Sequence, residues 1–135
     1  MCLTESILVV DDDEDFLKVL TILLKREGYK IETASTGKEA LEKTADNFYS
    51  LILIDRKLPD IDGVQLITKI QDTDQKMRKV IFTGFPSLNN VQQAIDFGVD
   101  AYLTKPIDPL EILNTIKDQL NNRNKDFKDR YTTLK

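Results

Sequence analysis

The sequence has no histidine and a single cysteine, Cys2, which lies at the N-terminal end of the 135-residue chain. One cysteine cannot form a disulfide within the chain, and it cannot build a cysteine-based metal site. The lack of histidine removes the commonest general base from any catalytic scheme. This cysteine usage fits a cytoplasmic location.

Long apolar runs are also missing, since stretches such as residues 51–54 are far shorter than a membrane span. The N-terminus lacks the basic-then-apolar layout of a signal peptide. The net charge of −4 and the pI near 4.9 argue against nucleic-acid binding, because a phosphate backbone favours clusters of Lys and Arg. We therefore expect this segment to bind neither a membrane nor a nucleic acid directly.

Apolar residues make up 41% of the chain, which is enough to fill the core of one domain of this length. Short β-rich runs alternate with amphipathic helical stretches, as is typical of βαβ units and of a parallel sheet covered on both faces. Strands are predicted at residues 6–10, 30–34, 51–54, 79–82 and 100–103. The sequence therefore predicts a doubly wound α/β fold with five βα units.

Helices are predicted after each strand, at residues 14–27, 37–47, from about 63, at 87–97 and from 109. Gly28 and Gly98 are suitable helix stops, and Asp62 and Ser87 are suitable N-caps. The apolar spacing of three of these helices indicates which residues face the core. These are Phe16, Leu17, Leu20, Leu23, Leu24, Ala40, Leu41, Thr44, Phe48, Leu110, Leu113, Ile116 and Leu120.

The compact domain is predicted to span residues 1–120, because residues 121–126 contain no apolar side chain. Beyond them, Phe127, Tyr131 and Leu134 resume spacings of four and three, roughly in phase with the preceding helix. Residues 121–135 are therefore interpreted as a C-terminal helical extension or a linker into a further domain. A frayed charged tail is the alternative.

Useful polar side chains follow four of the five predicted strands: Asp11 and Asp12, Asp55, Thr83 and Lys105. The carboxyl ends of parallel strands lie side by side, so these groups are expected to converge. Clustered carboxylates suit Mg²⁺, while a lysine charge and a threonine hydroxyl suit phosphoryl oxygens. The pattern predicts a metal-assisted phosphoryl acceptor.

Each of these residues alone has an ordinary structural explanation. The acidic run at residues 11–13 could be a helix start, and Thr83 or Lys105 could be a surface residue. Their joint placement at strand ends favours the site. Lys105-Pro106 is a candidate cis peptide bond, and Arg56 and Lys57 form an unusually basic pair beside the expected metal.

From Ser6 to about Leu120 the chain resembles the CheY-like receiver domain of two-component response regulators. The resemblance rests on five motifs, at residues 8–12, 52–55, 58–63, 83–84 and 102–106, which read LVVDD, ILID, LPDIDG, TG and YLTKP. It implies a flavodoxin-like three-layer sandwich with the strand order 2-1-3-4-5. Glu14 stands where many relatives have proline or another residue, which is a minor departure.

The resemblance assigns Asp55 as the phosphoacceptor, with a sensor histidine kinase or a histidine phosphotransfer protein as the phosphohistidine donor. It implies that Mg²⁺, or Mn²⁺, is held by Asp12, Asp55 and the backbone carbonyl of Lys57, and by Asp11 through a water molecule. Such a protein is not an enzyme acting on a separate substrate. It catalyses only its own phosphorylation and dephosphorylation.

The resemblance also implies a switch, in which Thr83 and Lys105 hold the new acyl phosphate and Tyr102 moves inward. The expected output face consists of the helix at 87–97, the strand at 100–103 and the last helix, and it is a possible homodimer surface. A half-buried, purely structural Tyr102 is the alternative. Phe85, two residues after Thr83, is expected to slow hydrolysis of the phosphoryl group.

Two rival functions are weighed against this one. A phosphohydrolase of the haloacid-dehalogenase type also uses a strand-end aspartate and Mg²⁺, but it needs a second Asp at the position of Lys57, and no cap-domain insertion is visible. A pseudo-receiver used only for docking should lack one or more of the site residues, yet all five are present. The output domain or effector, the cognate kinase and the oligomeric state stay open.

Overall fold

The computed structural model describes residues 5–70, 77–84 and 88–133, with side chains described except at 88–91 and 123–133. The predictions for Phe85 and Ser87, and for the side chains of Phe127, Tyr131 and Leu134, lie outside this part of the chain. The strands are β1 (Ser6–Val10), β2 (Lys30–Ala34), β3 (Leu51–Asp55), β4 (Arg78–Thr83) and β5 (Ala101–Thr104). They form one parallel sheet in the order β2-β1-β3-β4-β5. The predicted fold class and strand order are confirmed.

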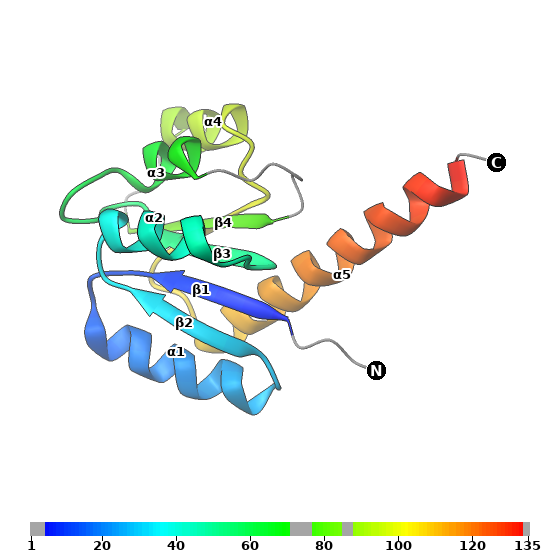
Figure 1. The fold of residues 1–135 in the computed structure, drawn as a ribbon. Coiled ribbons are helices and arrows are strands. Elements are labelled where there is room, and N and C mark those ends of the chain that lie inside the picture. The colour runs from blue at the N-terminus through cyan, green and yellow to red at the C-terminus, as the bar shows by residue number, and fades with distance from the viewer. Residues whose placement is uncertain (1–4, 71–76, 85–87, 134–135) are drawn as a thin grey trace.

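Five helices cover the two faces of the sheet: α1 (Glu14–Arg26), α2 (Gly37–Asp46), α3 (Gly63–Lys69), α4 (Leu88–Asp96) and α5 (Pro109–Thr133). Helices α1 and α5 lie on one face, and α2, α3 and α4 lie on the other (Figure 1). Side chains of β1, β3 and β4 alternate between two buried clusters, one on each face. This doubly covered sheet explains why the central strands read as continuous apolar runs.

Local signals in the sequence set most of the helix ends. Asp62 caps α3, its carboxylate accepting a hydrogen bond from the Val64 amide at 2.8 Å. Asp13 caps α1 in the same way, accepting from the Phe16 amide at 3.2 Å. Gly28 has a φ of 91°, in the left-handed region that favours glycine after a helix. The predictions for Asp62 and Gly28 are thereby confirmed.

Two residues predicted to face the core do not. Phe48 is 53% exposed, because α2 ends at Asp46 and the extended Asn47 turns the chain away before Phe48 is reached; Tyr49 is buried instead. Leu110 is 60% exposed. The buried stripe of α5 consists of Ile112, Leu113, Ile116 and Leu120. Leu110 lies roughly 100° around the helix from the centre of that stripe.

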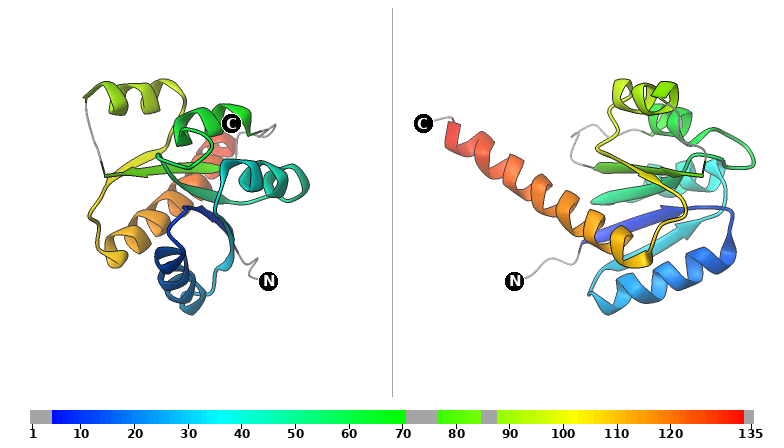
Figure 2. Two further views of the ribbon diagram at one scale, coloured as in Figure 1. Left: turned by 90° about the vertical axis from the view of Figure 1, so that its left-hand side faces the viewer. Right: turned by 180° about the vertical axis from the view of Figure 1, so that it is seen from behind.

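Helix α5 is continuous from Pro109 to Thr133 and extends well past the edge of the sheet (Figure 2). Its first half packs against the sheet through the buried stripe, while the second half projects away from the other elements. The backbone is therefore helical through the polar stretch at residues 121–126. Within the described part of the chain no helix is both long and apolar enough to cross a membrane. The division at residue 120 stays a prediction.

The loop after β3 is fastened to the start of α2 by Asp60. Its two carboxylate oxygens accept hydrogen bonds from the Gly37 amide at 2.8 Å and the Lys38 amide at 2.9 Å. These bonds hold the pKa of Asp60 below its ordinary value. A side chain on Gly37 would overlap Ile61, so the loop and the helix approach closely only because residue 37 is glycine.

Replacing Asp60 with asparagine is expected to lower the free energy of unfolding by about 1 kcal/mol at neutral pH, because one charged acceptor at a helix N-terminus is lost. The lowered pKa of Asp60 gives the sign of the pH effect. The stabilisation is present above pH ~4 and is lost as pH falls through the lowered pKa. Urea unfolding of both proteins at several pH values measures this, with Asp118→Asn at an exposed position of α5 as the control. A difference that persists at low pH would contradict the role given to the charge.

Candidate functional site

The structure brings the predicted strand-end residues together at the carboxyl edge of the sheet. Carboxylate oxygens of Asp11, Asp12 and Asp55 all lie within 4.8 Å of one another. The Lys105 ammonium, after β5, lies 3.3 Å from Asp55 Oδ2 and 3.6 Å from Asp11 Oδ2. Thr83 ends β4 next to them, and its backbone carbonyl accepts a hydrogen bond from the Lys105 amide at 2.7 Å. One lysine therefore faces a cluster of three carboxylates.

Asp11 is the most deeply buried member of this cluster. Its side chain is fully buried, and Oδ1 accepts a hydrogen bond from the Asp13 amide at 3.1 Å. Oδ2 is buried without a hydrogen-bond partner among the described residues. Burial raises the pKa of Asp11 to about 7, and the nearby Asp55 carboxylate adds to the increase. The Asp13 amide and the Lys105 ammonium offset this increase only in part.

These features fit a divalent cation. Three carboxylates of different burial bring oxygens close together, and one buried oxygen accepts no hydrogen bond from the described residues. Hard cations such as Mg²⁺ prefer oxygen ligands, and a cation here would favour the charged forms of the carboxylates. Asp55 Oδ1 also accepts from the Lys57 amide at 3.3 Å, and a bridge between Lys57 and Asp62 closes the following loop. That loop brings the Lys57 backbone next to the cluster.

Thr83 and Tyr102 lie where the sequence predicted them, on neighbouring strands. Thr83 is 2% exposed, and Thr83 pairs in register with Thr104 of β5. The Tyr102 ring packs against the cluster on the α2, α3 and α4 face, and its hydroxyl oxygen is buried without a hydrogen-bond partner among the described residues. A buried hydroxyl without an acceptor has a cost, which a rearrangement at this position can relieve.

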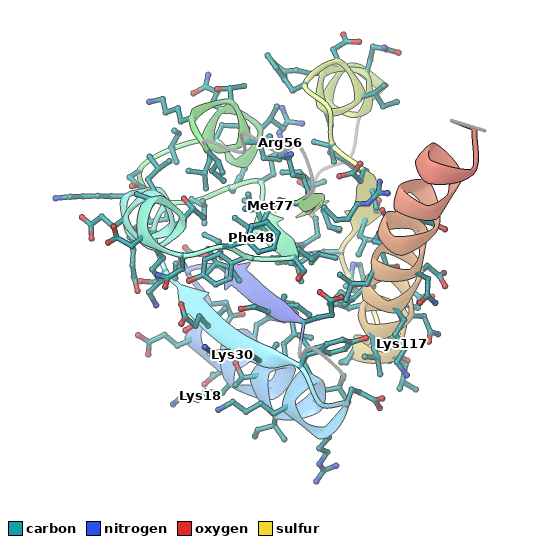
Figure 3. The ribbon with its side chains drawn as sticks, turned by 45° about the vertical axis from the view of Figure 1, so that its right-hand side comes forward. Lys18, Lys30, Phe48, Arg56, Met77 and Lys117 are labelled. Carbon is teal, nitrogen blue, oxygen red and sulfur yellow. The ribbon has the colours of Figure 1, made fainter. Side chains whose placement is uncertain are left out.

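Arg56 directly follows Asp55, yet its guanidinium turns toward the α3 and α4 side (Figure 3). Its Nε lies 3.3 Å from Asp62 Oδ2, and its other nitrogen Nη2 lies 2.8 Å from Gln93 Oε1 on α4. The side chain is 9% exposed. Arg56 is one member of the basic pair that the sequence places beside the expected metal. The Asp62 carboxylate offsets its charge. Lys105-Pro106 is cis, as the sequence suggested.

Two aromatic rings beside Lys105 form a part of the site that sequence reasoning missed. The Lys105 ammonium lies 4.6 Å from the centre of the Phe82 ring and 5.7 Å from the centre of the Phe16 ring. We expected Phe16 only as a core residue and Phe82 only as the end of a strand. The one available signal was that Phe82 precedes Thr83 and that Phe16 lies in the first turn after the acidic run.

Known proteins share this fold and this sequence pattern. The family model described as the response regulator receiver domain matches residues 7–117. The chain therefore belongs to the response regulator receiver domain family of two-component systems.

Individual relatives agree with this assignment. The chain is 34% identical over 115 residues to the transcriptional regulatory protein SrrA of Staphylococcus aureus, covering 85% of this chain and 47% of that protein. It thus spans about half the length of the curated relatives it matches. A CheY-like receiver domain protein from Methanospirillum hungatei is 38% identical with a TM-score of 0.87, covering 92% and 99% of the two chains. A Burkholderia pseudomallei response regulator solved with a phosphorylated aspartic acid is 30% identical with a TM-score of 0.77, covering 90% and 72%.

Proposed function

We propose that this receiver domain accepts a phosphoryl group on Asp55 from a phosphohistidine of a sensor histidine kinase or a histidine phosphotransfer protein. A carboxylate oxygen of Asp55 forms the new bond to phosphorus, and the bond between phosphorus and the imidazole nitrogen breaks. The observation that carries the proposal is the position of Asp55, with Lys105 Nζ at 3.3 Å and two further carboxylates beside it. A structural relative solved with a phosphorylated aspartic acid supports it.

Mg²⁺ or Mn²⁺ is the cofactor that the carboxylate cluster suits, with Asp12, Asp55 and the Lys57 backbone carbonyl as ligands and Asp11 acting through a water molecule. When bound, such an ion offsets negative charge on the transferring oxygens. Asp55 is held ready for this by the Lys57 amide, which donates to its Oδ1 at 3.3 Å. Asp11 and Asp12 supply the remaining charge of the cluster.

Lys105 and Thr83 are the residues that would hold the new acyl phosphate, through a compact charge and a hydroxyl donor. Tyr102 is the residue that would report the change to the surface formed by α4, β5 and α5. Only contacts that differ between the two states can shift such an equilibrium. The Lys105 amide, which donates to the Thr83 carbonyl, connects the end of β5 to the site, and the Tyr102 hydroxyl, which has no hydrogen-bond partner among the described residues, can gain one when the site changes. The same surface is a candidate for homodimer formation.

The output of the switch is proposed from the relatives. SrrA is described as a transcriptional regulatory protein and is about twice as long as the matched region. An output domain after residue 135, or a separate effector protein, would take the signal from the switch surface. The domain would act in the cytoplasm. Because the chain is acidic, any binding to nucleic acid would fall to the output domain or effector and not to the receiver domain.

A phosphohydrolase acting on small phosphoesters is the main alternative among enzymes. The position two residues after Asp55 holds Lys57, where such an enzyme needs a second aspartate. We therefore propose that the domain catalyses only its own phosphorylation and dephosphorylation. Incubation with a chromogenic phosphoester and Mg²⁺ is expected to give no turnover, and sustained release of the chromophore would support the phosphohydrolase.

Intact-mass spectrometry after incubation with acetyl phosphate and Mg²⁺ tests the proposed function directly. One labile phosphoryl adduct that disappears with EDTA is the expected result. A protein that takes up no phosphoryl group from acetyl phosphate or from a phosphorylated phosphotransfer protein would instead be a docking module.

Lys105→Ala is expected to keep Mg²⁺ binding while losing most of the phosphorylation-dependent switch. The carboxylate cluster does not include the lysine, so the cation ligands remain, but the contact that ties the phosphoryl group to the end of β5 is lost. Amide spectra of α4 and β5 with and without the beryllofluoride phosphoryl analogue measure the switch, and Mg²⁺ titration measures the site. Changes as large as in the wild type would contradict this role.

A further inference from the structure

The Lys105 ammonium lies between two kinds of partner. On one side are Asp55 Oδ2 at 3.3 Å and Asp11 Oδ2 at 3.6 Å. On the other are the rings of Phe82 and Phe16, whose centres lie 4.6 Å and 5.7 Å from Nζ. Both distances fall within the range in which an aromatic face attracts a cation. The lysine therefore has aromatic as well as carboxylate partners.

The two rings form one surface built from separate elements. Phe16 comes from the first turn of α1 and Phe82 from β4, and their centres are 5.3 Å apart with planes tilted by 37°. Phe82 is fully buried, and its strand pairing with Asp55 places it beside the phosphoacceptor. Phe16 is half-buried and packs against the buried apolar cluster on the α1 and α5 face, to which Phe82 belongs. The two rings that contact the lysine are thus held in place by the hydrophobic core.

The carboxylate partners of Lys105 are the groups that the proposed reaction uses. Asp11 and Asp55 belong to the cluster suited to a cation, and Asp55 would carry the phosphoryl group. A lysine has a long flexible side chain, which loses much rotational freedom when it is held in one place. Lys105 is 33% exposed, so burial alone does not hold it there. The aromatic faces attract the ammonium, but they neither bind a metal ion nor accept a phosphoryl group. The rings can therefore stay in contact with the Lys105 ammonium when Asp11 and Asp55 engage a metal ion or a phosphoryl group.

We propose that Phe82 and Phe16 are positioning residues for phosphoryl transfer, which hold the Lys105 ammonium over Asp55 through their aromatic faces. This inference rests on the proposed function, because Lys105 is the group through which they act. The pair makes the lysine preorganised, so its charge is in place before the phosphoryl group arrives. Leucine at either position keeps an apolar side chain but removes the aromatic face.

The first test uses the unphosphorylated protein and needs no reaction. Protons on the Lys105 ε-carbon, assigned by comparison with Lys105→Ala, should be shielded by the rings in ¹H–¹³C spectra of the wild type. Phe82→Leu should move them to the position of the other lysines, and Phe16→Leu should move them part of the way. Phe48→Leu is the matched control, since Phe48 is 53% exposed and precedes β3 at the opposite end from Asp55. Unshielded protons in the wild type would overturn the proposal.

The second test measures the rate of phosphorylation by acetyl phosphate. Phe82→Leu should slow it about threefold to tenfold, and Phe16→Leu should slow it less because that ring is farther away. In a Lys105→Ala background neither substitution should slow it further. Phe16→Tyr, which keeps the aromatic face, should retain the wild-type shielding and rate. The same loss in both backgrounds would show that the rings act only through packing.

The two tests also separate this inference from the proposed function. If the wild type takes up no phosphoryl group, the proposed function fails, while the shielding still decides whether the rings hold the lysine. If Phe82→Leu does not fold, the half-buried Phe16 gives the same comparison with less disturbance of the core.

Discussion

Asp55→Asn is expected to take up no phosphoryl group from acetyl phosphate, from a phosphorylated phosphotransfer protein or from a kinase. The substitution keeps the size of the side chain but replaces a nucleophilic carboxylate oxygen with an amide, which does not attack phosphorus. The fold should persist, because the Lys57 amide that donates to Asp55 Oδ1 still finds a carbonyl oxygen there. Removing one of three clustered carboxylates also reduces repulsion with Asp11. Intact-mass spectrometry measures the adduct, and urea unfolding measures the stability.

Asp118→Asn is the control for this experiment, because it makes the same chemical change at an exposed position of α5 far along the chain. It should be phosphorylated like the wild type, and EDTA should abolish the reaction in both proteins. An adduct that survives in Asp55→Asn would place the phosphoryl group on another residue and contradict the assignment. Loss of the adduct through unfolding would be recognised from the unfolding curve.

The arrangement of the strands could be predicted because it depends on local signals that agree with one another. The apolar runs ending at Val10 and Ile54 are buried on both faces, as continuous runs in a parallel sheet must be. The site followed from the same pattern, since polar residues directly after such runs meet at one edge of the sheet. Asp11, Asp55 and Lys105 were found in this way, and the structure brings them together.

The parts that sequence reasoning missed depend on contacts between distant segments. Spacing along the chain does not show that Phe16 and Phe82 meet around Lys105, or that Arg56 reaches Gln93 on α4. The error at Leu110 has a similar origin, because the face that a helix buries is chosen by the sheet it packs on. Capping was more predictable, as Asp62 shows, because a cap contacts only the first turn of its own helix.

Gly63 lies in close contact with the backbone at the end of β3, next to Asp55. Gly63→Ala is expected to lower the free energy of unfolding by about 1–3 kcal/mol. A Cβ at this position would lie 2.7 Å from the Asp55 carbonyl oxygen, 2.9 Å from Ile54 Cγ2 and 3.0 Å from Arg56 Cα. Two of these are backbone atoms of the segment that carries Asp55, so they cannot yield as a flexible side chain would. The higher helix propensity of alanine offsets only part of this cost. Mg²⁺ affinity should fall as well, because the end of β3 and the following loop must shift.

Gly84→Ala is the matched control, since a Cβ there would meet no atom of the described residues within 4 Å, and it should leave the urea midpoint nearly unchanged. Urea unfolding of the three proteins gives the stability, and Mg²⁺ titration followed by amide spectra gives the affinity. An unchanged midpoint in Gly63→Ala would mean that β3 and α3 separate at little cost. In that case the close packing of α3 on β3 would not be what holds Asp55 in position. Loss of Mg²⁺ affinity together with stability would instead tie the position of the carboxylate cluster to the absence of one methyl group at residue 63.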